Sequence, residues 1–217
     1  MSDWNSLHQE TQNVLDYLQK KKLAYFTNAV SKTLTTISWA SGSGSGFLSY
    51  RGDPTVGQYH QWILDGQYSA ILIDGSLLQI TYDFELGEVV GHRLAYVPCP
   101  FDIEPEFLSE MTPGDAVELY RLEKLSEIRL RSPVRFDFAP GQAKPGHPAS
   151  HLTINSATCR IACAAPIRIG RFVDFVYRHF YPKLHIAHNV YFSAVSSGSL
   201  GSDCISEEDG QGLHLRW

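Results

Sequence analysis

The densest group of chemically reactive side chains in this sequence lies between residues 135 and 160. Within these 26 positions the chain places Arg135, Asp137, Lys144, His147, His151, Thr153, Asn155 and Arg160. Arginine binds phosphate oxygens through two parallel hydrogen bonds, and histidine exchanges a proton near neutral pH. This combination of residue types is typical of a site that handles phosphate.

Strand periodicity predicts which of these side chains share a face, because alternate residues of a strand point the same way. Residues 129–138 have strand character with an internal Pro133, which favours an edge or bulged strand. Arg135 and Asp137 are two positions apart and therefore lie on one face of that strand. Residues 151–155 form a second strand, in which one face presents His151, Thr153 and Asn155.

A third strand over residues 158–164 contributes Arg160, and the proline-rich loop 139–150 contributes His147 and Lys144. If the three strands are neighbours, one polar face collects an acid, a histidine and two arginines. In that arrangement Arg135 and Arg160 hold a phosphate, with further contacts from Lys144, Thr153 and Asn155.

Three mechanisms use these residues. In metal-free acid–base catalysis, as in ribonucleases that cleave through the 2′-hydroxyl, His147 and His151 exchange protons and Asp137 orients one of them. A two-histidine, one-carboxylate metal site from the same three residues ranks second, because Pro148 opposes the helix that His-x-x-x-His spacing normally uses. A two-histidine phosphoesterase ranks last, because His151-Leu-Thr153 has no second His-x-Thr/Ser partner. The expected cofactor is therefore none or a divalent metal.

The charge distribution also points to this segment. Residues 1–120 carry 6 Lys and Arg against 15 Asp and Glu (net −9), residues 121–171 carry 9 against 3 (net +6), and residues 172–217 carry 3 against 5 (net −2), which sum to −5. The basic segment either forms a face that meets an anion or packs against the acidic part of the chain. The same residues also have a structural interpretation, with the histidines capping turns and Arg135 and Asp137 as surface charges.

Composition excludes several classes of protein. With 43% hydrophobic residues the chain has ample material for a core, so it is not intrinsically disordered. No apolar run reaches the ~18–20 residues that span a bilayer, and the N-terminus lacks the features of a signal peptide. Four dispersed cysteines do not form a disulfide scaffold. We therefore expect a cytoplasmic protein with no membrane association.

The coarse pattern predicts an α+β fold: a curved antiparallel sheet, partly open and barrel-like, with an N-terminal helix, an inserted helical segment and a helix in the C-terminal half. The expected helices cover residues 3–22, 116–125 and 171–181, with a further helical connection after Pro100. The expected strands cover residues 33–40, 70–74, 77–84, 89–97, 129–138, 151–155, 158–164, 184–195 and 213–217. Within the strand 77–84, Gln79, Thr81 and Asp83 form the exposed face.

The predicted organisation is a single α+β domain over residues 1–182. Residues 183–217 are expected to form a strand and loop extension that packs on this domain or trails from it. His179, His185 and His188 are expected to be mostly exposed. The glycine- and serine-rich stretch 41–46 lacks the lysine of a phosphate-binding loop.

Several segments resemble a bacterial family known as a domain of unknown function. They are Gly75–Gln79, Arg93–Pro100, Arg131–Phe138, His147–Asn155, Cys159-Arg160 and Phe172-Val-Asp-Phe. The resemblance covers most of residues 5–182, with the tail from Lys183 outside it. It implies a prokaryotic cytosolic protein from a mobile-element or phage-defence setting. Residues 135–151 also resemble small toxins of toxin–antitoxin systems, which implies a nuclease.

The leading functional hypothesis is a phosphodiesterase, a ribonuclease or other nuclease of a bacterial defence or toxin–antitoxin setting. The alternative is a non-catalytic module that binds a nucleic acid, a nucleotide or a protein partner in a defence complex. A third hypothesis is a structural subunit that forms oligomers through its aromatic strands.

Overall fold

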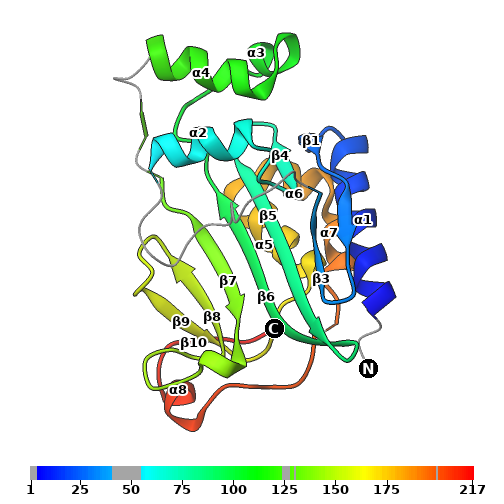
Figure 1. Ribbon diagram of the computed structural model, residues 1–217, viewed down its shortest axis with the longest axis vertical. Coiled ribbons are helices and arrows are strands. Elements are labelled where there is room, and N and C mark those ends of the chain that lie inside the picture. Colours follow the sequence, from blue (N-terminus) through cyan, green and yellow to red (C-terminus); the bar gives the residue numbers. More distant parts are fainter. Residues whose placement is uncertain (1–3, 41–54, 124–127, 130, 199) are drawn as a thin grey trace.

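A single sheet organises the chain in the computed structural model, which describes residues 4–40, 55–123, 128–129, 131–198 and 200–217 (Figure 1). The described strands are β1 (Ala24–Thr27), β2 (Val30–Lys32), β3 (Thr36–Trp39), β4 (Ala70–Leu72), β5 (Leu77–Glu85), β6 (Glu88–Val97), β7 (Val134–Phe138), β8 (Ser150–Ile154), β9 (Arg160–Cys163) and β10 (His214–Leu215). The described helices are α1 (Trp4–Lys20), α2 (Val56–Leu64), α3 (Pro105–Glu110), α4 (Pro113–Glu123), α5 (Ile169–Phe180), α6 (Pro182–Ala187), α7 (Asn189–Val195) and α8 (Glu207–Gln211).

The described strands follow the order β1-β4-β5-β6-β7-β8-β9-β10, and β3 pairs with both β2 and β5 beside this path. Every pairing is antiparallel except the parallel pairing of β9 with β10. The sheet is open rather than closed into a barrel. The predicted α+β fold on an open, mostly antiparallel sheet is therefore confirmed.

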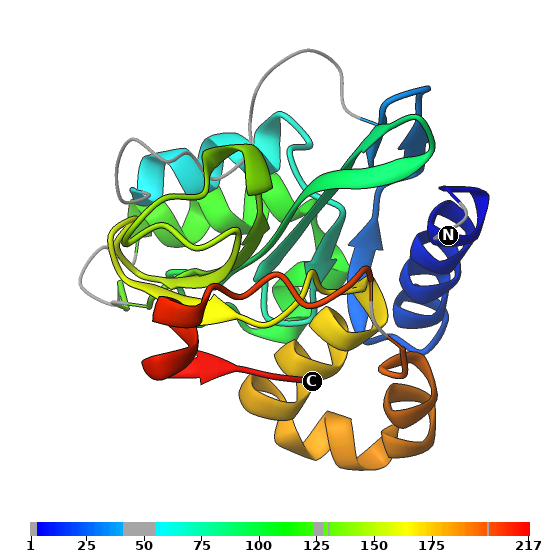
Figure 2. The same ribbon diagram turned by 90° about the horizontal axis from the view of Figure 1, so that it is seen from below.

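One face of the sheet carries the larger hydrophobic core, under α1, α5 and α7 (Figure 2). Alternate residues of β5 point to this face, including Ile80 and Tyr82, and they pack among buried side chains of α5 such as Phe172 and Val176. Helix α1 adds an apolar stripe at helical spacing: Leu7, Val14, Leu15 and Leu18. Among the described helices, none has the length and apolar character needed to cross a membrane.

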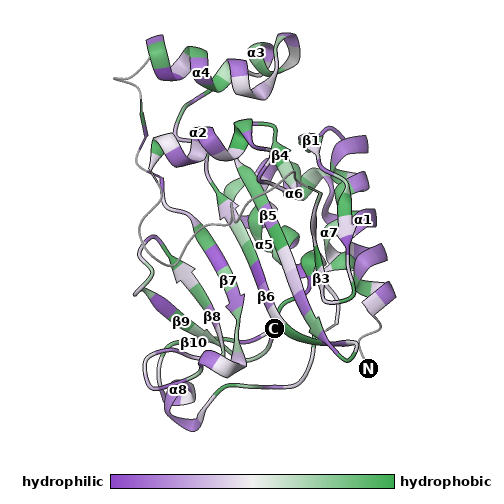
Figure 3. Cartoon of the chain, in the orientation of Figure 1, coloured by the Kyte–Doolittle hydropathy of each residue, from purple (hydrophilic) through white to green (hydrophobic). Residues whose placement is uncertain are grey.

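The opposite face changes character along its length. At one end, the apolar residues Leu77, Ala95 and Val97 pack under α2 and α4. Further along the same strands this face turns polar, and the hydropathy colouring shows a hydrophilic stretch in the middle of β7 (Figure 3). Buried polar side chains on a sheet face need hydrogen-bond partners, because burying a polar group without one costs free energy.

The C-terminal part departs from the sequence prediction. Residues 184–195, expected as a strand, form α6 and α7 instead, because Phe192 buries itself between Tyr177 and the ring of His185. Gly170 of α5 makes this packing close, since a Cβ there would lie 2.0 Å from the Val195 carbonyl oxygen. The expected final strand is present as β10.

The prediction that His185 and His188 are mostly exposed was also wrong. His185 Nε2 lies 2.8 Å from Asp174 Oδ1, and His188 Nδ1 lies 2.9 Å from the Tyr17 hydroxyl. Both side chains are half-buried. Together they connect the corner between α6 and α7 to α5 and α1.

The position of β7, the burial of Gln79 and the presence of three further elements also differ from the sequence prediction. β7 lies centrally between β6 and β8 and begins after Pro133, so the proline does not interrupt the ladder and the predicted edge position is wrong. Gln79, expected on an exposed face, is fully buried and donates to the Gln67 carbonyl oxygen. The elements β1, β2 and α2 were not predicted, and the glycine- and serine-rich stretch 41–46 lies outside the described residues.

His92 links the sheet to the start of α5. Its Nε2 accepts a hydrogen bond of 3.0 Å from the Ile167 backbone N–H, and its side chain is buried against Tyr82 and Phe138. Burial lowers the pKa of His92 to about 4. The folded protein therefore holds this histidine neutral, as an acceptor, at pH values where the unfolded chain binds a proton.

Stability is accordingly expected to fall as the pH drops from 6.5 toward 4, because the unfolded state then binds more protons than the folded state. The pKa of about 4 makes the contribution of His92 roughly 3 kcal/mol across this window. In urea unfolding, His92→Gln should be less stable than the wild type at pH 7, with the difference shrinking at pH 4.5. A difference that does not change with pH would contradict this.

Candidate functional site

Strand register brings polar side chains of five strands, β5 to β9, into two adjacent rows. In one row Thr81 of β5, Arg93 of β6, Asp137 of β7 and His151 of β8 lie opposite one another in successive pairs. In the next row Arg135 pairs with Thr153, and Thr153 pairs with Arg160 of β9. We call Arg93, Arg135, Asp137, His147, His151, Thr153 and Arg160 the polar cluster.

A buried ion pair lies at the centre of the polar cluster. Arg135 Nε donates to Asp137 Oδ2 at 2.6 Å, and the two side chains are only 3% and 0% exposed. The Thr153 hydroxyl donates to the same carboxylate oxygen at 3.4 Å. Because the sequence interpretation of surface charges requires exposure, this burial excludes it for Arg135 and Asp137.

His151 lies between this ion pair and the loop that follows β7. Its Nδ1 is 2.9 Å from the Pro148 carbonyl oxygen, which fixes Nδ1–H as the donor in the neutral ring. Its Nε2 is 3.5 Å from Asp137 Oδ2. Burial lowers the pKa of His151, and the Asp137 carboxylate opposes this effect. Because its single ring proton is donated to Pro148, the neutral His151 has no hydrogen at Nε2 to donate. His151 is therefore bonded to the loop and lies beside the carboxylate, without reaching solvent.

A tight turn presents His147 and Lys144. The turn residues are Pro145 and Gly146, with Gly146 at φ +72°, and backbone hydrogen bonds join Lys144 and His147 in both directions at 3.1 and 2.8 Å. Proline followed by a glycine of positive φ is the signature of a type II turn. Residues paired across such a bridge project to the same side, so Lys144 and His147 are neighbours.

The environment of His147 favours the neutral imidazole. Its ring centroid is 4.9 Å from that of His151, and its Nε2 is buried with no hydrogen-bond partner among the described residues. Burial lowers the pKa of His147, and the positive charges of Arg160 and Lys144 lower it further. A neutral imidazole with an unpartnered nitrogen is the form that accepts a proton.

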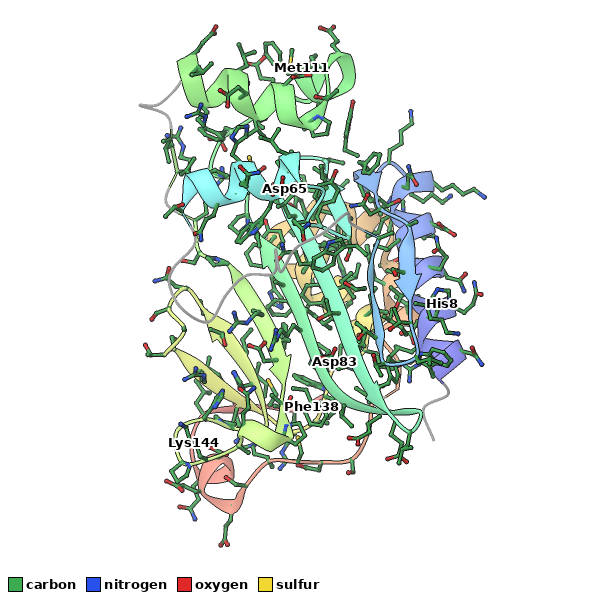
Figure 4. All side chains as sticks on the ribbon, viewed as in Figure 1. His8, Asp65, Asp83, Met111, Phe138 and Lys144 are labelled. Atoms are coloured by element: carbon green, nitrogen blue, oxygen red, sulfur yellow. The ribbon has the colours of Figure 1, made fainter. Side chains whose placement is uncertain are left out.

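His147 also lines a pocket of about 300 Å³. One wall is formed by the loop residues Ala143, Lys144, Pro145, His147, Pro148 and Ala149. The other wall comes from Cys204, Ser206, Glu208 and Asp209, in and before α8. Figure 4 labels Lys144 beside α8, where the loop and the C-terminal segment meet. The buried polar cluster therefore borders an open pocket through His147.

The structure separates the eight predicted site residues into three groups. Arg135, Asp137, His151, Thr153 and Arg160 share one face of the sheet, as the strand pattern predicts, and His147 joins them from the loop. Lys144 lies at the pocket rather than among the buried residues.

Asn155 does not share the face of His151 and Thr153. It lies beyond the end of β8 with φ +61°, so the strand alternation no longer applies, and its side chain is exposed. Arg93 is a member that the sequence analysis missed, although its position in an alternating strand gave the signal. Glu208 and Asp209 were also missed, because they lie far from the 135–160 segment in the sequence and no local pattern links them to it.

Within the part of the chain that the structure describes, no group of three or more His, Cys, Asp or Glu side chains is placed to hold a metal ion. The cysteines are free thiols, with Cys99 and Cys163 buried, Cys204 half-buried and Cys159 exposed.

Fold and site together define an α+β protein whose open sheet has an apolar core on one face and a buried polar cluster bordering a pocket on the other. The chain belongs to the family described as uncharacterized conserved protein (DUF2290), whose model matches residues 18–217. This match includes the tail from Lys183, so the resemblance extends further than the sequence segments indicated. No curated protein and no solved structure matches the chain.

The buried ion pair generates a stability prediction. Asp137→Asn leaves the Arg135 charge without its carboxylate and should lower the free energy of unfolding by about 3–5 kcal/mol. A matched control is Arg216→Ala, which breaks an ion pair with Asp203 whose side chains are 58% and 51% exposed and should change the free energy of unfolding little. Urea unfolding measures both. Equal small losses would show that the Arg135–Asp137 pair does not stabilise the fold.

Proposed function

We propose that this protein is a phosphodiesterase that cleaves RNA through the 2′-hydroxyl, with His147 as the general base. The observation that supports this most directly is the unpartnered Nε2 of His147, held neutral beside Lys144 at a pocket. A general base must be unprotonated at working pH and must face a space that admits substrate. His147 is the histidine of the polar cluster that lines the pocket, and in this mechanism the arriving substrate uncovers its buried Nε2.

In this mechanism His147 takes the proton of the 2′-hydroxyl while the 2′-oxygen attacks phosphorus. The bond from phosphorus to the 5′-oxygen breaks, which yields a 2′,3′-cyclic phosphate and a 5′-hydroxyl whose proton comes from water. Lys144 and Arg160, the cations that lower the pKa of His147, stabilise the charge that develops on the phosphate oxygens.

His151 takes a different role from the one expected from the sequence. An in-line displacement needs its acid and base on opposite sides of phosphorus, and a ring separation of 4.9 Å leaves no room for a phosphate between His147 and His151. We therefore assign His151 as a positioning residue that supports the ring of His147. The hydrogen bond from its Nδ1 to the Pro148 carbonyl oxygen positions His151 in turn, and the Arg135–Asp137 ion pair is buried beside it.

The biological setting that we propose is a bacterial defence or toxin–antitoxin system in the cytoplasm. The support for this setting is the sequence resemblance of residues 135–151 to small toxins. In such a system a protein partner that covers the pocket would control access of RNA to His147.

The proposal predicts cleavage of labelled RNA by the pure protein, with no cleavage of DNA, because DNA lacks the 2′-hydroxyl. His147→Gln should lower the rate by about a hundredfold or more with little change in melting temperature. His179→Gln, at an exposed position on α5, is the matched control and should retain full activity. Parallel reactions with EDTA and with Mn²⁺ report any requirement for a metal.

The rate should rise with pH through the pKa of His147, because only the neutral ring accepts the proton. Since burial and two cations lower that pKa, the midpoint should lie below the ordinary histidine value of 6.5. An RNA cleavage rate that is the same in His147→Gln as in the wild type would contradict the mechanism. Salt-sensitive RNA binding without cleavage would instead assign the pocket to a non-catalytic nucleic-acid or nucleotide-binding module.

A further inference from the structure

The two walls of the pocket beside His147 differ in charge. The loop wall presents Lys144 and His147, and the facing wall presents the carboxylates of Glu208 and Asp209. A ligand that satisfies both walls needs an anionic group at one end and hydrogen-bond donors at the other. At about 300 Å³, the pocket is at the lower end of the range for small-molecule sites, which suits one nucleotide rather than a longer segment.

The two carboxylates are not equivalent. Asp209 Oδ2 accepts a hydrogen bond of 2.6 Å from the Ser206 hydroxyl, whose oxygen caps α8 by accepting from the Asp209 N–H. Glu208, in contrast, has an exposed side chain with no hydrogen bond or ion pair to any other described residue. Glu208 is therefore the carboxylate with both oxygens available to a ligand.

The segment that carries Glu208 is held in place against the sheet. The Cys204 backbone N–H donates to the Ala164 carbonyl oxygen at 2.7 Å, just beyond the end of β9, and β10 then pairs with β9. Glu208 thus approaches the pocket from an anchored segment, which limits the conformational freedom that ligand binding has to remove.

The donor pattern of the bases decides which nucleotide fits. Single-stranded RNA exposes the Watson–Crick edges of its bases for recognition. Guanine presents two adjacent donors there, N1–H and the 2-amino group, which match the two acceptor oxygens of one carboxylate. Adenine and cytosine present one amino group beside an acceptor nitrogen, and uracil presents one N–H between two carbonyl oxygens, so each places an acceptor against the carboxylate.

From these observations we infer that the pocket between the 143–149 loop and α8 is a guanine site, in which Glu208 binds the base while Lys144 and His147 face the ribose phosphate. The inference rests on the proposed function and specifies its substrate: RNA cleaved on the 3′ side of guanosine. It follows from the opposed charges of the two pocket walls rather than from the polar cluster behind His147.

Binding of nucleoside 3′-monophosphates to the full chain tests this without any cleavage. Calorimetry should show that guanosine 3′-monophosphate binds about tenfold or more tightly than adenosine 3′-monophosphate. Inosine 3′-monophosphate, which keeps N1–H but lacks the 2-amino group, should lie between them. Equal affinities for the guanine and adenine nucleotides, or no binding of either, would overturn the inference.

Variants separate base recognition from phosphate binding. Glu208→Gln should remove most of the guanine preference, because the amide replaces one acceptor oxygen by a donor, while adenosine 3′-monophosphate binding stays unchanged. Glu207→Gln is the matched control, since it lies on the same short helix with the same charge but does not line the pocket, and it should keep the preference. Loss of the preference in both variants would show a general charge effect and contradict the role of Glu208.

Mapping the cleavage sites distinguishes this inference from the proposed function. Cleavage of RNA by the wild type at every base, dependent on His147, would support the phosphodiesterase and overturn the guanine site. Guanine-selective binding without RNA cleavage would support the guanine site and overturn the phosphodiesterase.

Discussion

The ion pair between Arg135 and Asp137 is the interaction on which the arrangement of this protein depends. Both residues belong to the central strand β7, and both side chains are almost fully buried. Burying two charges costs more than a single contact returns, so the neighbours must supply further polar groups. Thr153 on β8 does so through its hydroxyl, which makes the pairing of β7 with β8 a condition for stable burial of the charges.

Strand β7 places alternate side chains in two environments, the apolar core and the polar face. Phe136 of β7 points into the apolar core under α5, while the residues on either side of it point to the polar face. The sheet face that carries the polar cluster is apolar at one end, and helix α2 covers that end through Tyr59 and Trp62. Because strands set side-chain direction more rigidly than loops do, the buried members of the polar cluster have fixed positions, and the variable element is the loop that bears His147.

The sequence predicted the polar face correctly because alternation is local: Arg135 and Asp137, and likewise His151 and Thr153, are two positions apart. It did not reveal features that depend on contacts between distant segments. Residues 184–195 are rich in β-branched and aromatic types, yet the burial of Phe192 against α5 makes them helical. The position of Glu208 opposite Lys144 likewise depends on β10 returning to β9, which no spacing in the sequence encodes.

Burial decreases across the polar cluster toward the pocket, which distinguishes side chains that can contact a ligand from those that can only support them. Asp137 and His151 are fully buried, His147 is half-buried, and Lys144 is exposed. A group that meets substrate must be reachable, whereas a group that orients another works best when packing and hydrogen bonds hold it. Arg135, which the sequence analysis expected to hold a phosphate, and Asp137, which it expected to orient a histidine, are too buried to meet a ligand. In the proposed mechanism the group that meets substrate is therefore His147, at the surface end of the series.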